Sequence, residues 1–95
     1  MAELSTFLVI YTYPPGMAER RTPYRPDHLN WLRGLEAAGR MVLAGAVQDP
    51  VDTGVLVMRG TDAQDIRRLL LDDPYAIANL VVGATIRPIG LAVGG

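Results

Sequence analysis

The chain contains no cysteine and no lysine, and all nine of its basic residues other than histidine are arginine. The absence of cysteine excludes thiolate nucleophiles, cysteine-ligated metals and disulfide bonds. The absence of lysine excludes Schiff-base chemistry on a side-chain amine. A single histidine, His28, lies in the stretch Arg25-Pro26-Asp27-His28-Leu29. If the protein catalyses a reaction, proton transfer through His28 is the natural candidate.

Long apolar runs, targeting signals and cofactor motifs are also missing. No segment approaches the roughly 20 apolar residues of a membrane span, and the N-terminus has no signal-peptide pattern, so we expect a cytoplasmic protein. The net charge is −1 and the charges are scattered, which argues against nucleic-acid binding. No metal-ligand spacing or glycine-rich phosphate loop occurs, so neither a metal nor a cofactor is expected. With 95 residues, of which 49% are hydrophobic, the chain is expected to form one domain over residues 1–95.

The N-terminal third predicts a strand, a loop and a helix. Residues 4–13 are apolar at both odd and even positions, which indicates a strand covered on both faces. Pro14-Pro15-Gly16 ends this strand, and the polar stretch of residues 17–24 is expected to be a loop. Pro26 in the first turn and Gly39 at the end delimit a helix over residues 26–39.

The position of His28 on this helix is informative. With about 100° per residue, Trp31, Leu32 and Leu35 all fall within about 60° of His28 on the helical wheel. His28 therefore lies at the centre of the apolar stripe, on the side expected to face a sheet. Its place in the first helical turn favours the neutral imidazole, which is the form that can accept a proton.

The remainder of the chain predicts a hairpin, a helix and a final strand. Residues 41–47 and 53–59 are apolar segments joined by a short connection, so they form an antiparallel hairpin. Thr61-Asp62-Ala63-Gln64 resembles a capping box that opens a second helix, with Ile66, Leu69 and Leu70 inward. Asp73-Pro74-Tyr75 begins a short helical turn, and residues 81–89 form the last strand.

The element order is strand, helix, strand, strand, helix, strand. This is the ferredoxin-like α+β arrangement, βαββαβ, in which two helices cover one face of a four-stranded antiparallel sheet. The other face would be exposed in a monomer, although the strands are apolar on both sides. We therefore expect a homodimer in which two sheets pack face to face.

Asp73 is the residue best placed to partner His28. A carboxylate on a neighbouring element would orient the imidazole ring, and Asp72 and Asp73 both follow the second helix. Asp73 has a second explanation, because aspartate before proline commonly caps a helix. The two roles are compatible, since one carboxylate oxygen can cap the turn while the other faces His28. Asp72 is expected to be a solvated surface charge.

Other residues are candidates for contact with a small ligand. Tyr11 and Tyr75 are expected beside the site, although most tyrosines here would be core or interface rings. Arg25 could bind an anionic substrate beside His28, or could simply be solvated. Gly45, in Leu43-Ala44-Gly45, would mark a bulge or a close approach to a ligand.

These motifs together resemble the YciI-like (YCII-related) family of dimeric α+β barrel proteins. The resemblance rests on Arg25-Pro26-Asp27-His28-Leu29, on Leu43-Ala44-Gly45, on Asp73-Pro74-Tyr75 and on Ile86-Arg87-Pro88, and it spans nearly the whole chain. It implies an active-site pair of His28 and Asp73. In a related branch, such a pair supports dehydrochlorination of a chlorinated hydroquinone. The family often has Gly-Pro where this chain has Gly45-Ala46, which changes the expected pocket wall.

The sequence thus predicts a small lyase or isomerase-like enzyme. His28 would act as general base on a small organic substrate, and Asp73 would hold its tautomer. Two alternatives stay open at this point. The first is a non-catalytic dimeric module that binds a small ligand in the same pocket, and the second is a cofactor-free monooxygenase, by analogy of fold.

Overall fold

The structure is a computed structural model that describes residues 3–94. Its sheet has four antiparallel strands in the order β2-β3-β1-β4. This order, with a helical segment after β1 and another after β3, is the ferredoxin-like α+β fold predicted from the sequence. The strands are β1 (Ser5–Thr12), β2 (Met41–Val47), β3 (Thr53–Gly60) and β4 (Gly83–Pro88).

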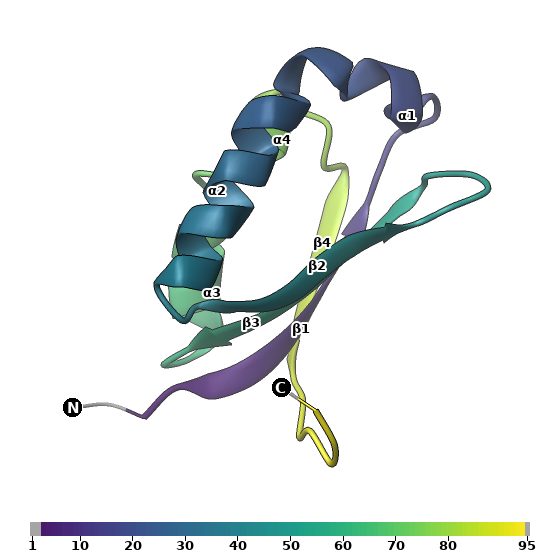
Figure 1. The fold of residues 1–95 in the computed structure, drawn as a ribbon. Helices are drawn as coiled ribbons and strands as arrows, with labels where there is room; N and C mark the ends of the chain where they lie inside the picture. The colour runs from purple at the N-terminus through teal and green to yellow at the C-terminus, as the bar shows by residue number, and fades with distance from the viewer. Residues whose placement is uncertain (1–2, 95) are drawn as a thin grey trace.

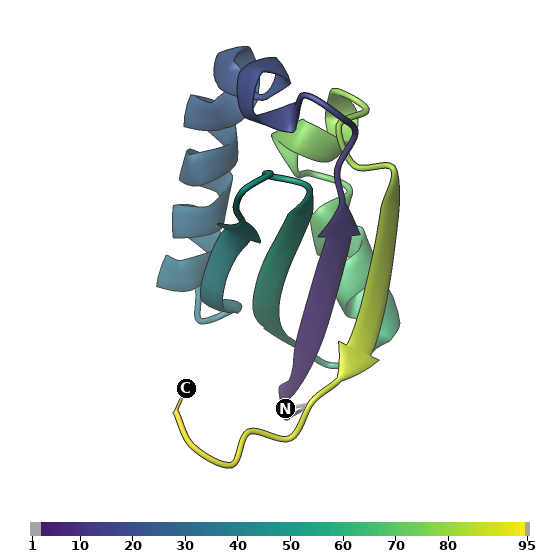
Figure 2. The ribbon, with the colours of Figure 1, turned by 90° about the vertical axis from the view of Figure 1, so that its right-hand side faces the viewer.

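Helices cover one face of this sheet, and Figures 1 and 2 show none on the other. Helix α2 (Arg25–Ala37) packs beside β2, and α3 (Ala63–Leu70) packs against β3 and β4. The short helix α4 (Pro74–Ile77) contacts α2. The two halves of the chain therefore meet where α2 and α4 lie side by side, and this junction positions the residues discussed below.

Alternation along β1 separates the two faces. Phe7, Val9 and Tyr11 are buried beneath the helices, whereas Leu8 and Ile10 are only half-buried on the opposite, outer face. Pairing with β3 and β4 extends the same division across the sheet. The core under the helices is completed by side chains from β3, α3, α4 and the segment that follows α4, namely Leu56, Met58, Ile66, Leu70, Tyr75 and Leu80.

The segment of residues 17–24 is helical and not the loop that the sequence predicts. Met17–Arg20 forms helix α1, and Thr22–Tyr24 forms the 3₁₀ turn η1. Gly16 enters α1 with φ of 74°, a left-handed conformation that glycine adopts without strain. Met17 is 1% exposed and anchors the turn in the core. Helices this short have no apolar periodicity, so the sequence pattern could not reveal them.

The helix ends follow local rules with one correction. Gly39, at φ of 75°, closes α2 through a Schellman motif in which the Gly39 and Arg40 amides donate to Glu36 and Leu35. At α3, the capping residue is Asp62 and not Thr61, because the Asp62 carboxylate accepts the Asp65 amide at 2.8 Å. A carboxylate is as good an N-cap as a hydroxyl. Because Thr61 and Asp62 are adjacent, the sequence alone does not decide which of the two caps α3.

Candidate active site

His28 lies in the first turn of α2 and is turned into the protein. The residue is 8% exposed, and its ring is stacked on Tyr75 with a centroid distance of 3.7 Å and an interplanar angle of 6°. The apolar stripe of α2 places the ring there, since Trp31 and Leu32 on the same face also pack against the core. This stacking fixes the plane of the imidazole ring. The faces of the ring are covered on the Tyr75 side, and the two ring nitrogens lie at its edge, where they can form hydrogen bonds.

Asp73 is the direct partner of His28. Its Oδ1 atom lies 2.7 Å from His28 Nδ1 and accepts the Tyr75 backbone amide at 2.9 Å. Its Oδ2 atom accepts the Tyr11 hydroxyl at 2.8 Å. Asp73 is 0% exposed, so these three partners replace water around the carboxylate. The capping role and the histidine contact occur together, as the sequence allowed, but both use the same oxygen.

Tyr11 supports the carboxylate and does not line the cavity beside His28. Its side chain is 1% exposed and directed at Asp73, because odd-numbered residues of β1 point beneath the helices. The expectation that Tyr11 contacts substrate is therefore corrected. Burial, followed by the negative charge of Asp73, raises the pKa of the Tyr11 phenol above its ordinary value. The hydroxyl remains a hydrogen-bond donor across the neutral range.

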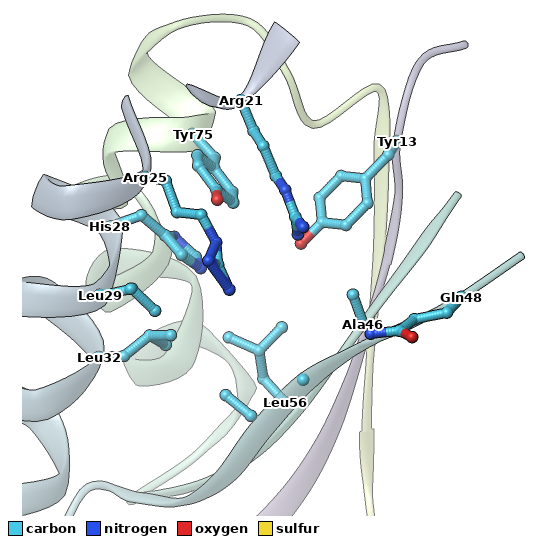
Figure 3. A pocket seen from close by; sticks show the side chains of 12 residues that line it. Tyr13, Arg21, Arg25, His28, Leu29, Leu32, Ala46, Gln48, Leu56 and Tyr75 are labelled. Atoms are coloured by element: carbon cyan, nitrogen blue, oxygen red, sulfur yellow. The ribbon is translucent and has the colours of Figure 1, made fainter. Parts of the chain in front are cut away.

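His28 lines a cavity of about 340 Å³, which lies between α2 and the hairpin of β2 and β3 (Figure 3). This volume is near the lower end of the range for small-molecule sites. Asp73 is not among the residues that line this cavity. One part of its lining is apolar, formed by Leu29, Leu32, Ala44, Gly45, Ala46 and Leu56. The other part is polar, formed by Tyr13, Arg21, Arg25, His28, Gln48 and Tyr75.

The structure gathers four of the predicted site residues around this cavity. His28, Arg25, Tyr75 and Gly45 line it, and Asp73 lies directly behind His28. Gly45 forms part of the wall in regular pairing with Val55. The irregularity in β2 falls between Met41 and Leu43, so Gly45 itself is not a bulge.

The sequence analysis missed Tyr13 and Arg21 as cavity residues. Tyr13 follows Tyr11 by two residues, and period-two alternation could have placed both on the same face. Its ring lies over Gly54, where a Cβ atom would collide with the Tyr13 hydroxyl. The sequence pattern does not identify Arg21, because it predicts a loop for residues 17–24. Arg21 nevertheless precedes Arg25 by four residues, about one helical turn. Figure 3 shows the Tyr13 and Arg21 side chains among those that line the cavity.

Neither a candidate metal site nor a membrane-spanning helix occurs in the described part of the chain. Residues 3–94 contain no group of three or more histidine, aspartate or glutamate side chains able to hold a metal ion. No helix within the same residues is long and apolar enough to cross a membrane.

Several solved structures share this fold at low sequence identity. A 5-chloro-2-hydroxyhydroquinone dehydrochlorinase from Burkholderia phenoliruptrix, in complex with 2,5-dihydroxybenzoquinone, has a TM-score of 0.79 and 18% identity, covering 90% of this chain and 93% of its own. A NIPSNAP-like domain protein from Burkholderia xenovorans has a TM-score of 0.61 and 16% identity, covering 100% and 91%. The cofactor-independent oxygenase SnoaB from Streptomyces nogalater has a TM-score of 0.54 and 17% identity, covering 97% and 96%.

The sequence comparisons identify the family. A search of curated proteins gave no significant match. The model of the YCII-related domain, however, matches residues 5–89, which include every strand and helix described above. The match extends over most of the chain and agrees with the resemblance seen in its motifs. This chain therefore belongs to the YCII-related domain family.

Proposed function

We propose that the protein is a small lyase or isomerase-like enzyme in which His28 is the general base and Asp73 orients it. The observation that carries the proposal is the 2.7 Å contact between His28 Nδ1 and Asp73 Oδ1 at the wall of a cavity. A histidine that is oriented by a buried carboxylate and borders a pocket is the arrangement that general acid–base catalysis requires.

Each ring nitrogen of His28 has its own role in the proposed reaction. A carboxylate has no proton to donate, so His28 Nδ1 carries the hydrogen of the contact with Asp73. The opposite nitrogen, Nε2, is then unprotonated and available to a molecule in the cavity. When Nε2 takes a proton, Asp73 stabilises the imidazolium that forms.

The proposed reaction class follows from a general base, His28, that is oriented by the Asp73 carboxylate. Nε2 removes a proton from a carbon or hydroxyl next to a carbonyl or phenol, and the freed electron pair forms a new double bond. In a lyase the double bond forms as the bond from carbon to the leaving group breaks, and the group departs as its anion with that electron pair. In an isomerase no group leaves, and the imidazolium returns the proton at another carbon. The fold shared with a dehydrochlorinase supports loss of chloride as a first reaction to test.

The test compares a variant of His28 with a variant of Asp72, the carboxylate next to Asp73 in the chain. Chloride release from 5-chloro-2-hydroxyhydroquinone is measured for the unaltered chain and for His28→Ala. We expect His28→Ala to lower turnover by about 10²–10⁴-fold, because the general base is lost. Asp72→Asn is the matched control, since Asp72 is exposed and next to Asp73 in the chain, and it should leave turnover unchanged.

Two results would argue against the proposal. Equal turnover by the unaltered chain and His28→Ala would remove His28 from the chemistry. Binding of small ligands without turnover in any panel of chlorinated or isomerisable phenols and ketones would favour the non-catalytic binding module instead.

We further propose that the partner of this chain is a second copy of itself, packed sheet against sheet. The outer face of the sheet carries apolar side chains on three strands, which apart from Val57 are half-buried or exposed, and Figure 2 shows no helix over it. An apolar face of this kind is unusual on a monomer and typical of a protein interface. The apolar residues of this face are Leu8, Ile10, Leu43, Val47, Val55 and Val57.

Sedimentation velocity at micromolar concentration tests the homodimer. The unaltered chain should sediment as a dimer, and Ile10→Glu should sediment as a monomer because it places a charge at the centre of the interface. Ile77→Glu is the control, since Ile77 is 69% exposed on α4, on the helical side of the sheet. A monomeric unaltered chain would contradict the proposal.

A further inference from the structure

We propose that Arg21, Arg25 and Tyr13 form an oxyanion subsite, so that the substrate is a small organic anion whose reacting proton lies within a few bonds of its charged group. This inference rests on the proposed function, because it names the substrate class for the same cavity. The anion would be a carboxylate or an acidic enol on an apolar ring or chain.

The charge of the cavity favours an anion. Arg21 and Arg25 line it, whereas no aspartate or glutamate does. The Asp73 carboxylate, which contacts His28, is fully buried and already accepts three hydrogen bonds. The ion pairs His28–Asp73 and Arg40–Asp65 involve neither of the two cavity arginines. Because Arg21 is half-buried, its charge is only partly solvated, and an anionic ligand would offset that cost.

The tyrosines of the cavity add donors at the same end. Burial raises the pKa of Tyr13, and the negative charge of Asp73 adds to this effect. Burial also raises the pKa of Tyr75, although the nearby charges of Arg21 and Arg25 act in the opposite direction. Both phenols therefore stay protonated at neutral pH and can donate hydrogen bonds. Two guanidiniums and two phenols present many donors and no charged acceptor, which is the complement of an oxyanion.

The spacing of these groups limits the size of the molecule. Arg25 and His28 are separated by three residues on α2, so their side chains are neighbours on the helix surface, about 5–6 Å apart at Cβ. Both side chains line the same cavity (Figure 3). An anion held by Arg25 would therefore place an adjacent or next-adjacent atom against His28. The apolar wall, which includes Leu32 and Leu56, accommodates the remainder of the molecule.

Binding of benzoate and its neutral analogue benzamide tests the subsite. Trp31 is the only tryptophan and its ring centroid lies 6.0 Å from that of His28, so its fluorescence reports occupancy, with calorimetry as a second measurement. We expect benzoate to bind at least about tenfold more tightly than benzamide, and this preference to shrink as salt is raised. Inorganic phosphate should compete weakly, because it cannot occupy the apolar part of the cavity.

Arginine variants identify the residues responsible. Arg21→Gln and Arg25→Gln should each weaken benzoate binding about tenfold or more and leave benzamide binding unchanged. Arg67→Gln is the control with the same change in net charge, since Arg67 is exposed on α3 and outside the cavity. Arg25 is itself exposed, so its replacement keeps the test valid if Arg21→Gln fails to fold. The inference is overturned if benzamide binds as tightly as benzoate, or if neither arginine variant changes the affinity for benzoate.

The outcome is separable from that of the proposed function. His28→Ala should retain benzoate binding while losing turnover. If the arginine variants lose binding and no variant or substrate gives turnover, the subsite stands and the proposed enzyme does not. If turnover depends on His28 and is unaffected by both arginine variants, the proposed enzyme stands and the subsite does not.

Discussion

Two aspartates of this chain occupy similar local positions and differ in what surrounds them. Asp73 precedes α4 and Asp65 lies in the first turn of α3, and each accepts a backbone amide and a basic side chain. The Asp73 side chain is 0% exposed and its partner is His28, which borders the cavity. The Asp65 side chain is 18% exposed and its partner is Arg40. A carboxylate at the start of a helix thus has an imidazole as its partner at Asp73 and a guanidinium as its partner at Asp65.

The partners decide what each pair can do. Arg40 also donates to the Arg59 carbonyl at 2.8 Å, so the Arg40–Asp65 pair ties the start of β2 to β3 and α3. An arginine keeps its charge at all relevant pH values, and such a pair can only stabilise the fold. His28 carries an imidazole, a group that can gain and lose a proton, and it borders the cavity. Both carboxylates accept a backbone amide and a basic side chain, so the two pairs differ in the basic partner, in the cavity and in the Tyr11 hydroxyl that Asp73 also accepts.

The comparison predicts its largest effect for Asp73→Asn. Asparagine can still cap α4, so the protein should fold, but its amide presents a different donor and acceptor set to His28 Nδ1. By analogy with other histidine–aspartate pairs, we expect turnover to fall by about 10³–10⁴-fold. Steady-state kinetics of chloride release, with circular dichroism as the folding check, measures this. Asp65→Asn should change turnover less than about twofold. If Asp73→Asn and Asp65→Asn lower turnover to a similar extent, the claim that only Asp73 supports catalysis is contradicted.

A smaller effect is expected when Tyr11 is replaced by phenylalanine. The change removes the Tyr11 hydroxyl that donates to Asp73 Oδ2 and leaves a buried carboxylate with one hydrogen bond fewer, at a cost of about 1–3 kcal/mol in the free energy of unfolding. Turnover should fall about tenfold, because the carboxylate is less firmly placed against His28. Urea denaturation and kinetics are the measurements. Tyr24→Phe is the control, since Tyr24 is 42% exposed, and equal losses of stability in both variants would contradict the argument.

Much of the Asp73 site could be predicted because its signals are local. The apolar stripe of α2 placed His28 inward, and Asp73-Pro74 marked a capped turn after α3. The strand order then followed from the alternation of elements, and it brings α2 and α4 together. Sequence spacing could not show how Oδ1 and Oδ2 divide their partners, since that depends on side-chain geometry across 62 residues between Tyr11 and Asp73.

The Asp65 site was not predicted at all. Its partner Arg40 is 25 residues away, and no periodicity links an arginine after one helix to the first turn of the next. The wrong assignment of the cap to Thr61 also concealed it, because the Thr61 amide in fact donates to Asp65. The loop assignment of residues 17–24 hid Arg21 in the same way. Contacts between short or irregular segments depend on tertiary packing, which a pattern of residue types does not encode.

The smallest predicted effect is the pH dependence of stability that Asp65 contributes. The amide of Thr61 holds the pKa of the Asp65 carboxyl below its ordinary value, against a partial opposing effect of desolvation, and the charge of Arg40 lowers it further. A carboxyl with a depressed pKa in the folded state stabilises the protein above its unfolded-state pKa, and that stabilisation is lost as the pH falls through the folded-state pKa. Because the pair is partly exposed, its contribution at neutral pH should be no more than about 1 kcal/mol. Melting temperatures of the unaltered chain and Asp65→Asn should therefore differ by a few degrees at pH 7 and converge as the pH falls through the folded-state pKa of Asp65. A difference that persists unchanged into strong acid would mean that Asp65 acts through packing and not through its charge.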